Sequence, residues 1–383
     1  MSIETELIAA KGHLDDCYDV VGIKGGTVPQ NECLANLPTA INSIPAYIPA
    51  DYGVATYEID QYGELHGMRN AVYPLNHFYN ITTVDNYGLY YNFYRDSTTK
   101  NIAFVTEFEG VNFHNLTSVG QYAFDHAFYG QDYASMISAS FDSLQSVSSS
   151  YAFNGAFQNC TNLYSISFPS LQTASGQRAF QSAFSNTAVT SVSFPSLVSI
   201  DGDSIFAEAF RNTDTLITVS FPLLETINRS MAFASCFYDC NNLSIANFPL
   251  LSEISGSSIF GSAFSKCASL TSISFPSLET ITGNNVFDWC FYQSYTFSNI
   301  SFPELVEIDG SDVFNRAFYS TSVQNISFPK LTTITSVDAF NKALTSSSVT
   351  EIHFKSSIQS VIENQTEYST KFGAPNATIY FDL

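Results

Sequence analysis

One twelve-residue phrase recurs along this chain. Residues 272–283 read SISFPSLETITG, with close copies at 165–176 (SISFPSLQTASG) and at 300–310 (ISFPELVEIDG). Aligning the chain on the phenylalanine of the phrase gives ten anchors at separations of 26 to 28 residues: Phe113, Phe141, Phe168, Phe194, Phe221, Phe248, Phe275, Phe302, Phe328 and Phe354. So constant a period is the signature of a solenoid, in which short coils stack because none can close a core alone. The repeat predicts an elongated rod rather than a globule.

A single unit indicates how each coil is built. In 270–275, LTSISF, Ile273 and Phe275 alternate with serines, which is the two-residue period of a strand. The proline that follows most anchors ends the strand because it has no N–H, and a Ser-, Thr- or Asp-Gly step then turns the chain. Phe287 and Phe291 stand four residues apart, the spacing of a short helical turn. We therefore predict an α/β solenoid with a parallel sheet and with three ladders of phenylalanine in its interior.

The complete pattern, L-x-x-I-x-F-P-x-L-x-x-I-x-G-x-x-x-F-x-x-A/C-F-x-x-C/T, resembles the BspA-like, or Treponema-type, leucine-rich repeat over about residues 105–355. An irregular earlier copy stands at 84–94. The units are longer than the usual repeat of that family and carry a second phenylalanine in the helical segment. The resemblance implies a leucine-rich-repeat-like, right-handed stack of 26–28-residue coils. It also implies a microbial surface or virion protein that adheres to proteins or glycans and is not an enzyme.

Four regions follow from these patterns: a helical attachment module at 1–45, an irregular linker and N-terminal cap at 46–80, the solenoid at 81–350 and a C-terminal cap at 351–383. The last region keeps the strand, drops the proline and then shows a helix-like stretch and a final strand. A solenoid needs such a cap to cover its exposed core.

The N-terminal region carries a second resemblance. Apolar residues at helical spacing and a Gly-Gly/Pro turn predict two short helices in 1–45. The phrase IKGGTVPQNECLANLPTAINSIP at 23–45 resembles a short module of tail-associated proteins of phages and prophages of gut bacteria. That resemblance implies docking to a virion tail or baseplate. A plain helical hairpin that caps the solenoid remains the alternative.

The charge and hydropathy of the chain disfavour several classes of binding partner. The chain has 14 Lys and Arg against 35 Asp and Glu, a net charge of −21, which disfavours binding to nucleic acid and to anionic lipid. No segment approaches the ~18 apolar residues of a membrane span, and residues 1–17 lack the pattern of a secretory signal. We therefore expect no membrane insertion. The resemblance of 23–45 to tail-associated modules implies a virion protein assembled in the bacterial cytoplasm, which would explain the missing signal. The alternative is a bacterial cell-surface adhesin exported by an unrecognised route.

Cysteine usage points to a reducing compartment. Cys160, Cys240 and Cys267 occupy a repeat position that is Thr or Ser in other copies, and Cys236 and Cys290 occupy one that is otherwise Ala. Cysteine in slots for small residues behaves as a buried, reduced thiol rather than as part of a disulfide framework.

No catalytic or cofactor motif is present. The six histidines form no metal-ligand pattern, and no nucleophile elbow, P-loop or dinucleotide fingerprint occurs. We therefore predict that the chain is not an enzyme and holds no cofactor or metal. The Asp-Gly turns at 200–204 and 308–312 are assigned to Asx turns or helix N-caps, with calcium as the alternative. The single tryptophan, Trp289, lies beside a core position and is assigned to packing.

The outward strand positions define one candidate binding surface. Stacked coils would place their small hydroxyl and amide side chains on the outer face of one parallel sheet, suited to a host-surface glycan or protein; the alternative is a solvated structural face. A symmetric assembly, a homotrimer, would add avidity. The candidate ligand-binding residues are Ser165, Ser167, Ser191, Ser193, Thr218, Ser220, Ser272, Ser274, Asn299, Ser301, Asn325 and Ser327.

Overall fold

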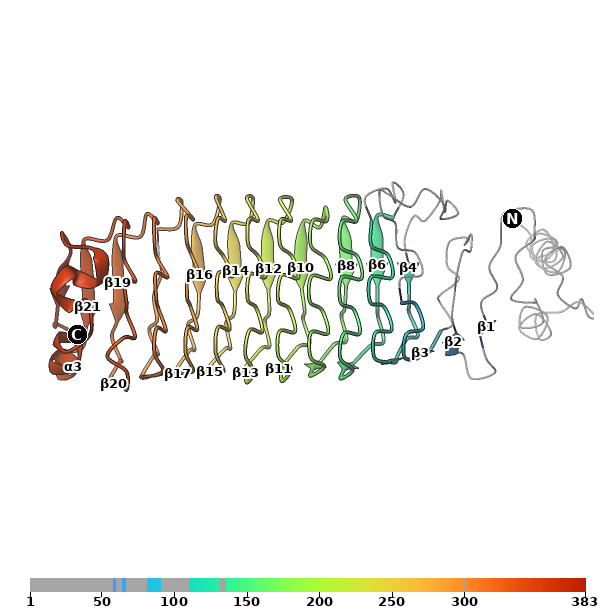
Figure 1. Cartoon of the computed structure of the whole chain (residues 1–383), viewed down its shortest axis with the longest axis horizontal. Helices are drawn as coiled ribbons and strands as arrows, with labels where there is room; N and C mark the ends of the chain where they lie inside the picture. Colours follow the sequence, from blue (N-terminus) through green and yellow to red (C-terminus); the bar gives the residue numbers. More distant parts are fainter. Residues whose placement is uncertain (1–57, 60–63, 67–80, 91–110, 131–135, 299) are drawn as a thin grey trace, which may run out of the picture.

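The structure is a computed structural model that describes residues 58–59, 64–66, 81–90, 111–130, 136–298 and 300–383. In this part of the chain, short coils stack side by side along one axis, and the C-terminus lies at one end of the row (Figure 1). Two sides of each coil carry short strands, and the third carries a series of tight turns. The predicted solenoid with parallel sheets is therefore confirmed. The helical module predicted at 1–45 lies outside the described residues.

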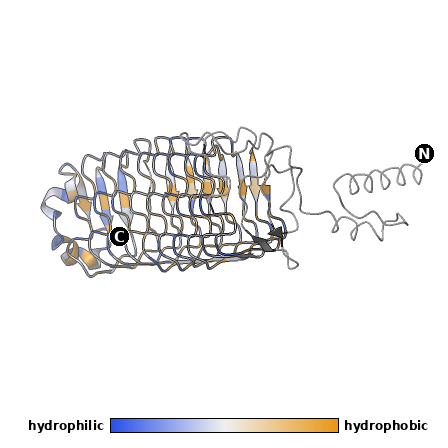
Figure 2. Ribbon diagram, turned by 45° about the vertical axis from the view of Figure 1, so that its right-hand side comes forward, coloured by the Kyte–Doolittle hydropathy of each residue, from blue (hydrophilic) through white to orange (hydrophobic). Residues whose placement is uncertain are grey.

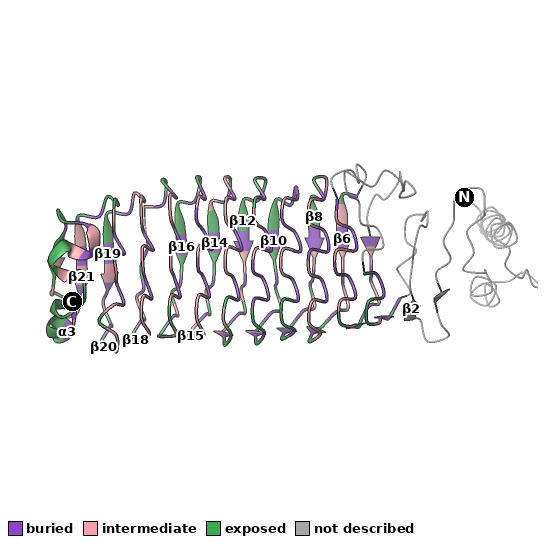
Figure 3. Cartoon of the chain, in the orientation of Figure 1, coloured by how far each residue is buried: buried purple, intermediate pink, exposed green. Residues whose placement is uncertain are grey.

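The strand wall is the side that carries the repeated phrase. Its strands pair in parallel, and paired residues are 27 positions apart through the middle of the row, as in Val192 with Val219 and Ala246 with Ile273. Buried and exposed residues alternate along the strands, so their inner side chains reach the core while the outer ones meet solvent (Figure 3). The strands are β4 (Val111–Asn112), β6 (Ser138–Ser140), β8 (Ser165–Ser167), β10 (Ser191–Ser193), β12 (Thr218–Ser220), β14 (Ile245–Asn247), β16 (Ser272–Ser274), β19 (Asn325–Phe328), β21 (Glu351–Phe354) and β22 (Thr378–Tyr380).

The narrow wall carries the second, shorter strand of each coil. Ile254, Ile281 and Ile308 pair in register here and are fully buried. A continuous parallel sheet runs from β7 to β20, and β3 and β5 join β1 and β2 in a further sheet. The strands are β1 (Glu58–Ile59), β2 (Glu64–His66), β3 (Thr83–Val84), β5 (Ser118–Val119), β7 (Ser146–Val147), β9 (Thr173–Ala174), β11 (Ser199–Ile200), β13 (Thr226–Ile227), β15 (Glu253–Ser255), β17 (Thr280–Thr282), β18 (Glu307–Asp309) and β20 (Thr333–Ile334).

The third side, the turn wall, is built from four-residue turns and not from helix. In the coil at 258–266, Phe260 and Ser262 donate their amides to carbonyls of the next coil at 2.8 Å, while Ala263 closes a turn onto the carbonyl of Phe260 at 3.0 Å. Every fourth residue has a left-handed backbone, such as Ser258 with φ 54° and Ser262 with φ 53°. The corresponding segments are 122–130, 151–159, 178–186, 204–212, 231–239, 258–266, 285–293 and 312–320.

This wall corrects the prediction of a helical turn. Phe287 and Phe291 are both buried, as the four-residue spacing implies, but two buried residues alternate with two outward ones along 286–293. Each left-handed non-glycine residue costs roughly 1–2 kcal/mol. The bonds to the next coil offset that cost because they replace the internal bonds of a helix. The α/β assignment was therefore wrong for this segment, and the coils are all-β with turns.

Three ladders of phenylalanine fill the interior. The ring centroids of Phe221 and Phe248 lie 5.3 Å apart at 8°, and those of Phe248 and Phe275 lie 5.5 Å apart at 17°. The turn wall contributes two more ladders, and rings of neighbouring ladders meet edge to face, as Phe221 and Phe233 do at 78°. Both geometries suit the aromatic quadrupole, and each fully buried ring contributes roughly 1.5–3 kcal/mol. The predicted ladders are present, and the third ends at Phe318 because the next coil has Leu344 at that position.

The glycine at the turn after the narrow wall is required by close stacking. Gly256, Gly283 and Gly310 occupy this position in consecutive coils. A Cβ atom on Gly283 would lie 2.3 Å from the carbonyl oxygen of Gly256, and its φ is +139°. A side chain here would force neighbouring coils apart.

The C-terminal region ends the stack with the few helices among the described residues. The ring of Phe372 is buried against Phe340, and its backbone carbonyl accepts a hydrogen bond from the amide of Leu344 at 2.9 Å. The region therefore covers the last coil. Hydrophilic and hydrophobic residues alternate in its ribbon (Figure 2). None of the helices in the described residues has the length and apolarity to cross a bilayer. The elements after β21 are η2 (Ser356–Ile358), α3 (Gln359–Glu363), η3 (Tyr368–Gly373) and then β22.

Replacing Gly283 by alanine should destabilise the protein by about 1–3 kcal/mol, because the new methyl group overpacks the contact with the preceding coil. Gly261→Ala is the matched control. The nearest atom to its Cβ lies at 3.3 Å, other coils carry Ala207 or Ala234 at this position, and the loss should stay within about 0.5 kcal/mol. Urea denaturation followed by circular dichroism measures both. Equal losses would contradict the close-stacking account.

Candidate functional site

Eleven of the twelve predicted residues lie on the outer face of the strand wall, exposed or half-buried; Asn299 lies outside the described residues. Register places them in rows along the stack, because Ser191 pairs with Thr218 and Ser193 with Ser220. Apart from the exposed Ile245, the rows form a surface of hydroxyl and amide groups without a charged side chain between β8 and β19. The structure thus brings the predicted residues together on one face, and their part in binding remains a prediction.

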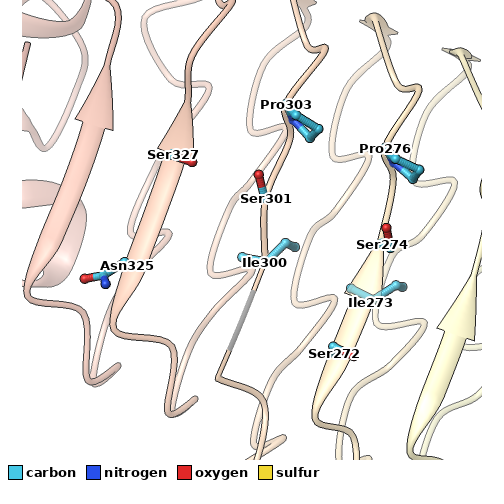
Figure 4. A pocket seen from close by; sticks show the side chains of 9 residues that line it. All are labelled: Ser272, Ile273, Ser274, Pro276, Ile300, Ser301, Pro303, Asn325 and Ser327. Carbon is cyan, nitrogen blue, oxygen red and sulfur yellow. The ribbon is translucent and has the colours of Figure 1, made fainter. Parts of the chain in front are cut away.

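The sheet of this wall is broken between β8 and β10, and it is broken again at one coil between β16 and β19. Strands β10 to β16 form one hydrogen-bonded run and β19 to β22 another, and residues 300 and 301 between them have no strand conformation. A groove of about 400 Å³ crosses the wall at this interruption (Figure 4). Its lining residues are Ser272, Ile273, Ser274, Pro276, Ile300, Ser301, Pro303, Asn325 and Ser327.

A single bulky core residue accounts for the interruption. Phe297 occupies the position that is leucine in the three preceding coils, as in Leu270, and its ring stacks on Phe291 at 4.5 Å. At this step the centroids of Phe275 and Phe302 are 6.1 Å apart, against 5.5 Å at the steps before and after it. We infer that the larger ring spreads the coils at this step and weakens the strand pairing, so that the groove opens here.

The groove combines polar edges with an apolar surface. Ser274, Ser301 and Asn325 supply hydroxyl and amide groups that both donate and accept hydrogen bonds. Pro276 and Pro303 project to the same side of the wall from neighbouring coils (Figure 4). No lining residue is titratable, so the groove offers hydrogen bonds and apolar contact to a ligand but no general acid or base.

Sequence reasoning missed two residues of the strand face. Ile245 and Asn247 pair with Ser272 and Ser274 in register and are exposed, Ile245 to 41%. Their coil departs from the Ser-x-Ser pattern, which is why pattern matching passed over them. Counting 27 residues from Thr218 would have found Ile245. The two prolines of the groove were read as strand terminators only.

The aspartates of the Asp-Gly turns link coils instead of capping helices. Asp201 Oδ1 accepts from Asn228 Nδ2 at 3.1 Å, and Asp309 Oδ1 accepts from Thr335 Oγ1 at 2.6 Å, each in the next coil. The Asx-turn and N-cap assignment therefore missed the partner of these two side chains. Within the described ranges, no three His, Cys, Asp or Glu residues gather as a metal site would require.

The buried thiols share one role with the hydroxyls that replace them. Cys240 Sγ donates to the carbonyl of Phe210 at 3.0 Å, and Thr213 Oγ1 donates to that of Phe184 at 3.2 Å. All five cysteines of the described ranges are free and buried, and burial raises the pKa of the Cys240 thiol well above its usual value. Cys160, Cys240 and Cys267 are therefore structural donors.

The sequence also matches the model of a known protein family. The model described as "BspA type Leucine rich repeat region (6 copies)" matches residues 91–236, 181–316 and 234–372, which together span more than half of the chain. The chain belongs to the BspA-type leucine-rich repeat family. The resemblance noted in the repeat pattern is thereby confirmed, and the fold is one typical of non-enzymatic binding proteins. None of the curated proteins matches the chain.

Three solved structures illustrate the likeness. A leucine-rich repeat protein from Bacteroides ovatus is 17% identical with a TM-score of 0.46, and the alignment covers 82% of this chain and 71% of that one. The T. pallidum leucine-rich repeat protein is 22% identical with a TM-score of 0.35, covering 58% and 90%. An internalin from Listeria monocytogenes is 9% identical with a TM-score of 0.26, covering 70% and 74%. None of these similarities identifies a ligand.

Proposed function

We propose that this BspA-type protein is a non-enzymatic adhesion protein whose strand wall holds a neutral glycan of a host or mucosal surface in the groove between β16 and β19. One observation carries the proposal: the interrupted sheet opens a groove on the hydroxyl- and amide-lined face, at residues that the repeat pattern had already singled out.

The lining favours a neutral sugar over a charged ligand. Serine and asparagine side chains exchange hydrogen bonds with sugar hydroxyls, and the proline rings and Ile300 offer an apolar surface to the C–H face of a pyranose. No lining side chain carries a charge to pair with an ionic group, and a charge placed there would lose hydration without compensation. An open groove of this kind gives weak contacts, so we propose that a homotrimer supplies avidity.

The site of action is a separate part of the proposal. We propose that residues 1–45 attach the chain to a phage tail or baseplate and that the solenoid faces the host. The supporting observation is the sequence resemblance of 23–45 to tail-associated modules. A bacterial surface adhesin of the same family uses the same solenoid, so the two placements differ only in what residues 1–45 hold.

Changing Ser274 and Ser301 together to aspartate should weaken glycan binding by more than about tenfold, because two carboxylates would be desolvated against the ligand. Ser193→Asp is the matched control, since it adds a carboxylate at an equivalent exposed strand position outside the groove. A glycan array probed with the full chain and the variants measures the effect. Unchanged binding by the double variant would reject the strand wall as the site.

Mass spectrometry of purified phage particles from the host that carries this gene should detect the chain together with tail proteins. Removing residues 1–45 should leave it out of the particles. Recovery on the bacterial cell surface, with none in the particles, would favour the surface adhesin and would leave the glycan proposal standing.

A further inference from the structure

Partly exposed aromatic rings on the turn wall are held between side chains of the two adjoining coils. The ring of Tyr238 has the guanidinium of Arg211 over it at 4.8 Å, from the preceding coil, and the ammonium of Lys266 at 5.2 Å, from the following coil. A cation on an aromatic face is attracted by the negative face of the ring. The ring of Tyr238 thus has one cation over it from each adjoining coil.

A second ring has the same arrangement. Tyr151 stacks on Tyr122 of the preceding coil at 4.8 Å and 11°, and Arg178 of the following coil lies over it at 5.6 Å and donates Nη1 to its hydroxyl at 3.0 Å. Coil stacking therefore supplies each of these rings with one partner from each side.

Trp289 has partners from its own coil and from the following coil, but not from the preceding coil within the described residues. Arg316 of the following coil lies over the indole at 5.1 Å, and Tyr292 of its own coil meets it edge-on at 85°. The matching positions of the preceding coil are Gly261 and Ser262, and within the described ranges no ring or cation of that coil lies over the indole. The ring is also partly exposed, so it lies on the outer side of the turn wall and not in the phenylalanine interior. One half of the sandwich is missing.

The charge beside the ring favours a cation. Asp288 is half-buried, its Oδ1 accepts from Asn315 Nδ2 at 2.9 Å, and burial raises its pKa to about 6 although Arg316 opposes the shift. At neutral pH this carboxylate is charged and poorly solvated, so a second nearby cation would stabilise it. The net charge of −21 attracts cationic partners at longer range.

We propose that the side of Trp289 that faces Gly261 and Ser262 is a docking site for an arginine side chain of a partner protein, distinct from the glycan groove on the strand wall. Arginine is chosen over lysine because its planar guanidinium stacks on aromatic rings. The wall itself supports this choice, since Arg178, Arg211 and Arg316 each cover one of its rings. Tryptophan and arginine are also the residues that most often anchor protein interfaces.

The single tryptophan of the chain makes the test specific, because one indole N–H resonance reports on Trp289 alone. The full chain is titrated with acetyl-Gly-Arg-Gly-amide and with the same peptide carrying citrulline, the neutral isostere of arginine. The arginine peptide should shift the indole resonance saturably, with half-saturation on the order of 0.1 M for one exposed contact, and the citrulline peptide should not. Equal shifts by both peptides, or no shift by either, would overturn the proposal.

A pair of variants locates the binding. Ser262→Arg should occupy the vacant side from within the chain, move the indole resonance in the direction that the peptide does, and abolish the response to the peptide. Ser235→Arg is the matched control, because it has the same repeat position and a similar φ, 51° against 53°, but faces Ser262 in the next coil. It should leave the response intact. A full response in Ser262→Arg would place the peptide elsewhere and overturn the proposal, whereas the glycan array tests the strand wall independently.

Discussion

In-register stacking of coils is the constraint on which the rest of the structure depends. A coil of about 27 residues has no core of its own, so each must complete the hydrogen bonds and the ring contacts of its neighbours. On the turn wall, alternate amides bond to the next coil, as those of Phe260 and Ser262 do. This arrangement tolerates a left-handed residue at every fourth position, and it holds only while the repeat length keeps the rings of the three ladders over one another. The rows of outward residues on the strand wall follow from that register.

Much of the fold could be predicted because register leaves a direct trace in the sequence. The spacing of the ten anchor phenylalanines predicted the stack, and the Ser-Ile-Ser alternation predicted which strand residues face out. The turn wall could not be separated from a helix in this way. A spacing of four residues, as between Phe287 and Phe291, suits a helix and the observed turns equally well. The hydrogen bonds to the next coil decide between these two structures, and the sequence of a single coil does not encode them.

Side chains whose hydrogen-bond partners lie in a neighbouring coil were harder to interpret from the sequence, for the same reason. Cys240 and Thr213 were correctly recognised as buried and interchangeable, but their shared hydrogen-bond donation became evident only with the carbonyls of the preceding coil in place. The replacement of cysteine by threonine and serine, and not by alanine, at this position was the available signal. The groove was unpredictable in a similar way, because Phe297 looks like one more core aromatic until its ring is seen to widen the step between Phe275 and Phe302. The place of Trp289 on the outer side of the turn wall could not be read from the sequence, because its partners Arg316 and Tyr319 belong to the next coil.

The two proposed sites use different walls for different chemistry. The strand wall presents uncharged hydroxyls and amides because its outward positions repeat serine, threonine and asparagine. The turn wall varies from coil to coil and can therefore place tryptophan, aspartate and arginine together at one point. Both sites use the same part of the stack, because Trp289 lies in the coil that begins with Ser272 and Ser274, and Arg316 lies in the coil of Ser301.

Amide hydrogen exchange of Phe248→Ala, followed by mass spectrometry, tests the central claim of in-register stacking most directly. Phe248 stacks on Phe221 and on Phe275, each 27 residues away in the chain. The account predicts faster exchange in the segments 216–224 and 270–278, comparable to that in 243–251, and no change near Phe141. Faster exchange confined to 243–251 would contradict it.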